Sequence, residues 1–144
     1  MSYKFVEIIK KISNKYQYSL SETERKFNEV YYTEFDLALK IINHLFFYKK
    51  IENIWKQKFL EPSVGLGNFV FAYLFYISTN YTLTKKEVIE LYGNIYVCDN
   101  DKKVLKLYKE LLKRSSIEFF KIKLPKTHIF HIGNELIYNL SSDD

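Results

Sequence analysis

This chain of 144 residues is poor in the residues that cross-link or bend a backbone, with one cysteine, two prolines and four glycines. The single cysteine, Cys98, excludes an internal disulfide and any metal site that needs several thiolates. Because Cys98 lies inside an apolar run, we expect it to be a small buried hydrophobic residue. Disulfide-rich scaffolds and thiolate metal centres are therefore excluded.

Long hydrophobic runs are also missing. The longest apolar stretch, residues 69–77, is about half as long as a membrane-spanning helix. Charged side chains from Lys4 onward interrupt the apolar residues near the N-terminus, so no signal peptide is predicted. We expect a cytoplasmic protein without membrane contact.

Aromatic side chains, in contrast, are abundant, with 13 tyrosines, 12 phenylalanines and an aromatic share of 18%. Either a coding bias toward AT-rich codons or aromatic stacking surfaces for bases would explain them. A hydrophobic fraction of 47% with 27% charged residues fits one soluble globular domain. The net charge of +5 permits contact with nucleic acid without requiring it.

Residues 1–50 are predicted to be a helical N-terminal region. Apolar residues at helical spacing indicate a helix over residues 3–12, and residues 21–24 resemble the capped start of a second helix. Thr33 can cap a third helix. The apolar face expected for that helix consists of Phe35, Leu37, Ala38, Ile41, Ile42 and Leu45.

Residues 51–144 alternate between strand and helix. We predict strands at 58–61, 95–98 and 127–132, with helices at 68–77, 85–91 and 101–114 between them. Residues 78–84 and the segment around Pro125 are predicted loops. The order β-α-β-α-β favours a parallel sheet with right-handed crossovers. The predicted fold class is therefore α/β, with the helical region as a cap.

Each predicted strand ends at a polar side chain that can contact a ligand. These side chains are Glu61, Asp99 and Asn134. In open α/β sheets, ligands bind outside the carboxyl ends of the strands. We therefore expect three separate segments to converge on one crevice.

The first of these strand ends continues into a glycine turn. Glu61 and Pro62 are followed by Gly65, Gly67 and Phe69, and a helix begins at once. The glycines let the backbone approach a ligand and adopt positive φ. An ordinary strand–helix turn with a solvated acid is the alternative.

The same segment resembles motif I of the amino-group DNA methyltransferases, D/E-P-x-x-G-x-G-x-F, at all five specified positions. The resemblance implies a Rossmann-like methyltransferase fold, here with an incomplete parallel sheet, and S-adenosyl-L-methionine as cofactor. Glu61 would accept hydrogen bonds from the cofactor or balance its amino group and sulfonium. A dinucleotide-binding turn matches less well, because Val70 stands where it has a third glycine.

Two further strand ends resemble later motifs of that family. Asp99 resembles the acid of motif II, which binds both ribose hydroxyls of the cofactor. Asp101 is its nearby competitor, although as the residue that opens the next helix it suits a capping role. Asn134 stands at the position of the motif III acid, which accepts a hydrogen bond from the adenine amino group. A plain strand-end turn is the alternative for Asn134.

Upstream, Tyr31-Tyr32-Thr33 resembles motif X, Y-Y/F-T-P, with Glu34 in place of the proline. The threonine of that motif contacts the methionine end of the cofactor, whereas a plain helix cap is the alternative role for Thr33. The order of the four motifs is that of the adenine-N6 DNA methyltransferases.

The family's catalytic box, D/N-P-P-Y/F, has no counterpart, because the only prolines are Pro62 and Pro125. That box holds the flipped adenine. The resemblance therefore implies the cofactor-binding portion of a DNA adenine-N6 methyltransferase of a restriction-modification system, inactive alone. DNA would be a partner of the complete enzyme, and a polypeptide with the missing C-terminal half a further partner. We predict no catalytic residue in this chain and no metal site.

Two other functions are compatible with the sequence. The acceptor of the methyl group could be RNA, a protein side chain or a small molecule. The chain could also be a non-catalytic partner subunit or binding module that retains the fold, in which case it would have no affinity for the cofactor.

Overall fold

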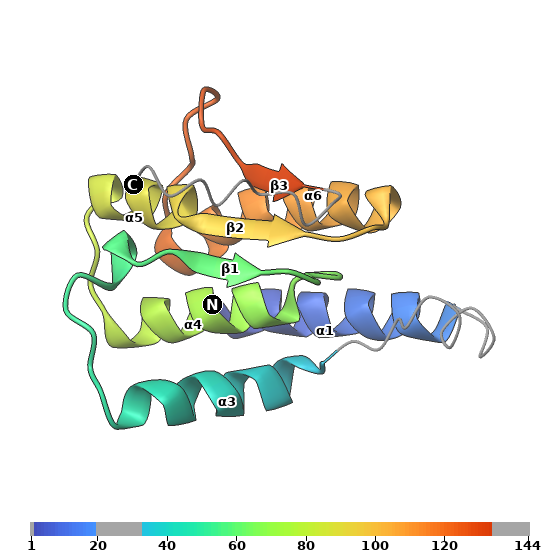
Figure 1. Ribbon diagram of the computed structural model, residues 1–144, viewed down its shortest axis with the longest axis horizontal. Coiled ribbons are helices and arrows are strands. Elements are labelled where there is room, and N and C mark those ends of the chain that lie inside the picture. The colour runs from blue at the N-terminus through green and yellow to red at the C-terminus, as the bar shows by residue number, and fades with distance from the viewer. Residues whose placement is uncertain (1, 20–32, 134–144) are drawn as a thin grey trace.

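The computed structural model describes residues 2–19 and 33–133. In these residues a small parallel sheet has the order β1-β2-β3, formed by β1 (Phe59–Glu61), β2 (Ile95–Cys98) and β3 (His131–Gly133). Leu60 pairs with Tyr96, and Tyr96 in turn pairs with His131. Figure 1 shows the strands running in one direction. The predicted α/β class and β-α-β-α-β order are confirmed for this part of the chain.

Helices connect the strands. Helices α4 (Asn68–Asn80) and α5 (Lys85–Gly93) follow β1, and α6 (Lys102–Phe120) follows β2. The start of α5 is fixed by a capping box, in which Thr84 and Glu87 exchange side-chain and backbone hydrogen bonds. A short 3-10 helix, η1 (Ile54–Lys56), precedes β1.

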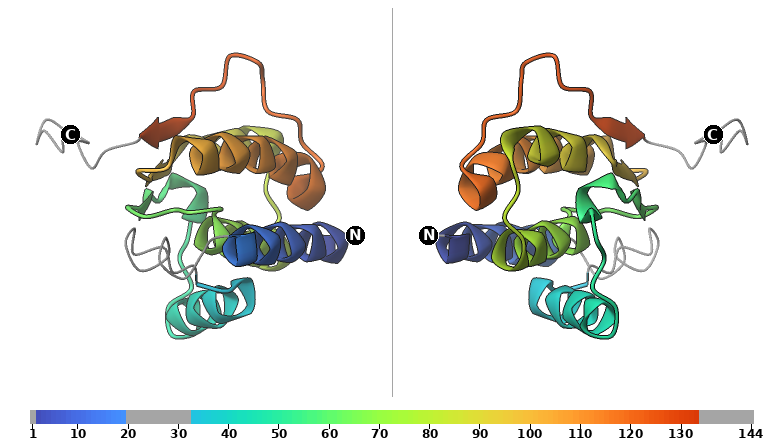
Figure 2. Two further views of the ribbon diagram at one scale, coloured as in Figure 1. Left: turned by 90° about the vertical axis from the view of Figure 1, so that its right-hand side faces the viewer. Right: turned by 90° about the vertical axis from the view of Figure 1, so that its left-hand side faces the viewer.

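The helical layer is built around α4, which is buried along most of its length. The long N-terminal helix α1 (Ser2–Ser19) packs against α4 and α6, and α3 (Phe35–Phe47) packs against α4. Figure 2 shows the strands at one side of the molecule and these helices beside them. Among the described residues no helix is both long and apolar enough to cross a membrane.

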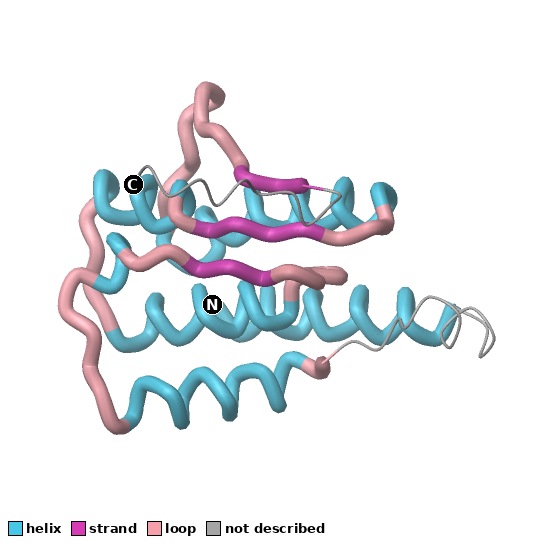
Figure 3. Tube along the Cα trace, viewed as in Figure 1, coloured by secondary structure: helices cyan, strands magenta, loops and turns pink. Residues whose placement is uncertain are grey.

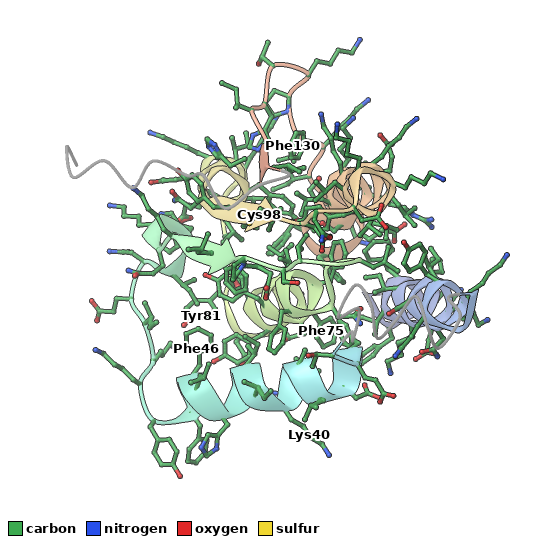
Figure 4. All side chains as sticks on the ribbon, turned by 45° about the vertical axis from the view of Figure 1, so that its right-hand side comes forward. Lys40, Phe46, Phe75, Tyr81, Cys98 and Phe130 are labelled. Atoms are coloured by element: carbon green, nitrogen blue, oxygen red, sulfur yellow. The ribbon has the colours of Figure 1, made fainter. Side chains whose placement is uncertain are left out.

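Aromatic rings fill the space between these elements. Phe59 of β1 stacks on Tyr73 of α4 at 4.6 Å between ring centroids. Phe46 of α3 stacks on Tyr76 at 5.1 Å, and Figure 4 shows Phe46 and Phe75 between α3 and α4. Much of the aromatic content therefore packs inside the protein.

The two faces of the sheet are covered differently at β1. Phe59 faces α4, whereas the next residue, Leu60, is 51% exposed. Because side chains alternate along a strand, Leu60 lies on the opposite face together with its partners Tyr96 and His131. Tyr96 and His131 stack at 4.3 Å.

Several predicted helices were too short, and the predicted third strand was misplaced. Helices α1, α4 and α6 continue past the predicted residues 12, 77 and 114. In the extension of α6, Phe119 and Phe120 pack on the core. The extension of α4 is polar, and its side chains donate hydrogen bonds to the carbonyls of Phe75 and Tyr76. The predicted strand at 127–132 is wrong over most of its length, since only His131–Gly133 pairs with β2. The preceding residues form the loop that rises above the sheet in Figure 3, with a turn from the His128 N–H to the Pro125 carbonyl.

The expected inward face of α3 is partly wrong. Phe35, Ala38 and Ile42 are buried, but Leu37, Ile41 and Leu45 are exposed. The apolar band of α3 is wider than the surface that α4 covers. The helix predicted at residues 21–24 lies outside the described residues.

Candidate functional site

The turn between β1 and α4 depends on its two glycines. Gly65 has a φ of +54° and Gly67 a φ of +94°, both in the region that favours glycine. A Cβ atom on Gly67 would lie only 2.7 Å from Tyr108 Cδ2 and 2.8 Å from Phe71 Cε2. The turn therefore brings the start of α4 close under α6, where no side chain fits at Gly67.

Asp99 joins this turn to the end of β2. Its Oδ2 accepts a hydrogen bond from the Gly65 N–H at 2.9 Å, and its Oδ1 accepts one from the Asp101 N–H at 3.0 Å. The Val64 N–H donates to the Cys98 carbonyl at 3.0 Å beside them. Since a carboxylate offers about four acceptor positions, Asp99 retains capacity for a ligand. Of the three segments predicted to converge, those that follow β1 and β2 therefore meet through Gly65 and Asp99.

Asp101 has a different role. Its Oδ1 accepts hydrogen bonds from the backbone N–H groups of Lys103 and Val104, at 2.9 and 3.2 Å, and so caps α6. Its Oδ2 accepts from the Tyr16 hydroxyl at 2.8 Å. The predicted helix cap is confirmed, and both oxygens of Asp101 are engaged within the protein.

Glu61, the last residue of β1, is a second carboxylate at the carboxyl edge of the sheet. It is half-buried, and its Oε1 accepts a hydrogen bond from the Ser63 N–H at 2.9 Å. Burial raises the pKa of the Glu61 carboxyl, the Ser63 N–H opposes this, and the nearby Asp99 charge adds to it. A positively charged ligand group would be favoured between these two acids.

Cys98, the last residue of β2, contacts the backbone of Pro62, which is itself exposed. The Cys98 thiol donates to the Pro62 carbonyl at 3.2 Å, and Cys98 is buried as predicted. Burial, with the neighbouring acids, raises the pKa of this thiol. Cys98 is therefore a poor nucleophile and serves the packing of the strand.

Thr33 contacts Asn68, the first residue of α4, which directly follows the same turn. Its carbonyl accepts a hydrogen bond from Asn68 Nδ2 at 2.8 Å, and Asn68 Nδ2 also donates to Ser13 Oγ at 3.1 Å. The alternative role of Thr33 as a helix cap is wrong, because Glu34 holds the N-cap position of α3 and makes no side-chain cap bond. The helix starts one residue later than Thr33 would require.

Sequence reasoning missed three residues of this region: Ser13, Tyr16 and Asn68. Ser13 and Tyr16 lie on the part of α1 beyond the predicted helix end, and they reach Asn68 and Asp101. Tyr16 follows the apolar residues Ile9 and Ile12 at helical spacing, which was the available signal. Asn68 is buried, and its Oδ1 has no partner among the described residues.

The remaining candidates are less well placed. Asn134 lies outside the described residues, as do Tyr31 and Tyr32. The preceding residue, Gly133, accepts a hydrogen bond from the Asp99 N–H at 3.2 Å, so the third strand ends beside Asp99. Within residues 2–19 and 33–133, no three His, Cys, Asp or Glu side chains are grouped as metal ligands.

Comparison of the chain with models of known protein families, with curated proteins and with solved structures finds no match. The resemblance to the four methyltransferase motifs therefore stays a prediction from the residues themselves.

Proposed function

We propose that this chain is the S-adenosyl-L-methionine-binding portion of a DNA adenine-N6 methyltransferase with a Rossmann-like fold. The observation that carries the proposal is the junction of Gly65 and Asp99, whose backbone N–H and carboxylate lie 2.9 Å apart. Two segments that resemble motifs I and II meet there, although 34 residues separate them in the chain.

The chemistry of this edge suits the proposed cofactor. S-adenosylmethionine carries a positive sulfonium and an amino group, and Glu61 and Asp99 supply two carboxylates. Asp99 can still accept hydrogen bonds from two adjacent hydroxyls, as the ribose of the cofactor presents. Thr33 lies near the first turn of α4 through Asn68, where the methionine end would lie.

Methyl transfer to adenine would need residues that this chain does not contain. The reaction moves a methyl group from the sulfonium to the adenine amino nitrogen, and the base must be extruded and held. No Pro-Pro pair occurs in the 144 residues. We propose that the box which holds the adenine comes from additional polypeptide. In a doubly wound sheet, the fourth strand pairs with the first. The β1 edge, with the exposed Leu60, is the corresponding position here.

Calorimetric titration of the folded chain with S-adenosylmethionine tests the proposal. We expect saturable binding of one cofactor, and no transfer of labelled methyl groups to DNA by this chain alone. A folded chain that binds no cofactor would contradict the assignment. Methyl transfer by the 144 residues without another polypeptide would contradict the division of labour.

A further inference from the structure

Helix α3 carries a row of exposed apolar side chains. Leu37, Ile41 and Leu45 are 53%, 39% and 61% exposed. They are spaced by four residues and so form one continuous row along the helix surface. Figure 1 shows α3 at the outside of the helical layer, with α4 above it.

The row lies on the side of α3 that faces away from α1. The opposite flank is marked by Asp36, whose carboxylate pairs with Lys10 of α1 at 2.9 Å. At about 100° per residue, Ile41 and Leu45 lie roughly 140° and 180° around the helix from Asp36. None of the described elements covers the row, whose side chains are all exposed.

Opposite charges lie at the two ends of the row. Glu34 is exposed at the N-terminal end of α3, and Lys49 is exposed just past its C-terminal end. Such a row is complementary to itself when a second helix is laid against it in the antiparallel direction. With Ile41 on a twofold axis, Leu37 faces Leu45 of the other copy, and Glu34 faces Tyr48, the residue next to Lys49. The two helix dipoles then also oppose each other.

We propose that two copies of this chain associate through antiparallel α3 helices, with the Leu37–Ile41–Leu45 row at the centre of the interface. The interface is isologous, the commonest arrangement in soluble oligomers. Ile41 meets its own counterpart on the axis, so one substitution changes both side chains of the central contact. The proposal does not depend on cofactor binding.

Sedimentation velocity of the full chain over about 1 to 100 µM tests the proposal. We expect a concentration-dependent monomer–dimer equilibrium. Ile41→Lys should raise the dimer dissociation constant by at least about thirtyfold, because central apolar contacts dominate such interfaces. Asn43→Lys is the matched control, since it adds the same charge to the flank that carries Asp36 and should leave the dimer intact. Circular dichroism shows that each variant is folded.

A charge exchange tests the antiparallel register. Glu34→Lys and Lys49→Glu should each weaken the dimer several-fold, since each brings like charges close together at the ends of the interface. Both changes in one chain should restore the dimer to within about twofold of the unmodified protein. The proposal is overturned by a monomer at every concentration, which would assign the row to a different partner. It is also overturned by a dimer that resists Ile41→Lys but is broken by Leu60→Lys at β1.

Discussion

The turn after β1 and the turn after β2 both lie at the carboxyl edge of the sheet and both lead into a long helix. Helix α6 is capped by Asp101, which accepts hydrogen bonds from two backbone N–H groups of its first turn. Helix α4 has Gly67 at its N-cap position and so has no side-chain cap. Its turn instead relies on two glycines with positive φ.

This difference separates a structural acid from a candidate ligand acid. Asp101 is engaged with α6 and with Tyr16, so its oxygens are used to hold the fold. Asp99 bridges the two turns, and a polar group of a ligand could join it there. Uncapped N–H groups at the start of a helix also suit a polar ligand. The β2 turn therefore serves stability, whereas the proposed function assigns the ligand to the β1 turn.

The largest effect is expected at Gly67. Gly67→Val forces a β-branched residue into positive φ and places its Cβ against Tyr108 and Phe71. We expect the free energy of unfolding to fall by about 2 to 5 kcal/mol, measured by chemical denaturation.

Gly65→Val is the matched comparison in the same turn. It carries the positive-φ cost of about 1 to 3 kcal/mol, and should also reduce cofactor binding because its Cβ hinders backbone approach. Normal cofactor binding by both glycine variants would show that the turn is purely structural.

Exchanging the two aspartates for alanine should separate binding from stability. Asp99→Ala should weaken S-adenosylmethionine binding by on the order of 1.5–3 kcal/mol, roughly tenfold to a hundredfold. Asp101→Ala should lower the free energy of unfolding by about 1 kcal/mol through the lost cap, with a smaller effect on binding. Calorimetry and denaturation of both variants measure this, and the reverse ranking would remove Asp99 from the site.

The smallest effect concerns Glu61 and pH. Its pKa is raised in the folded protein, above the ordinary value of 4.5, chiefly by burial. The folded state therefore binds the proton more tightly than the unfolded state. The free energy of unfolding falls as pH rises from the ordinary value of 4.5 through the raised pKa of Glu61. A cationic cofactor favours the ionised acid, so its binding should strengthen over the same window. Glu61→Gln should flatten both profiles, and an unchanged binding profile would place the cofactor away from Glu61.

The residue types of the candidate site could be predicted because they occur in short segments of the sequence. The Glu-Pro pair and the two glycines lie in one short segment, and the two acids directly follow β2. Period-two and period-3.6 patterns locate the strands and helices around them. The parallel order predicts that the segments after β1 and β2 lie at one edge of the sheet. The contact between Gly65 and Asp99 also requires that β1 and β2 are neighbours, as the structure shows.

The remaining features depend on packing, which one sequence does not specify. The exposed side of α3 could not be foreseen, because Leu37, Ile41 and Leu45 have the same apolar character as the buried residues beside them. The contacts of Ser13 and Tyr16 required the length of α1 and its placement against α6. Most of the predicted third strand was wrong. Residues 127–130 have side chains that favour strands, but they form a loop, and only His131–Gly133 pairs with β2.

We propose that S-adenosylmethionine binds where Gly65 meets Asp99. Titration of the isotope-labelled chain with the cofactor, followed by amide chemical shifts in nuclear magnetic resonance, tests it most directly. We predict saturable shifts centred on the amides of Gly65, Gly67 and Asp99, which disappear at the same cofactor concentrations in Asp99→Ala. Shifts confined to another surface would place the cofactor elsewhere, and a folded chain without any shifts would show that it does not bind this cofactor.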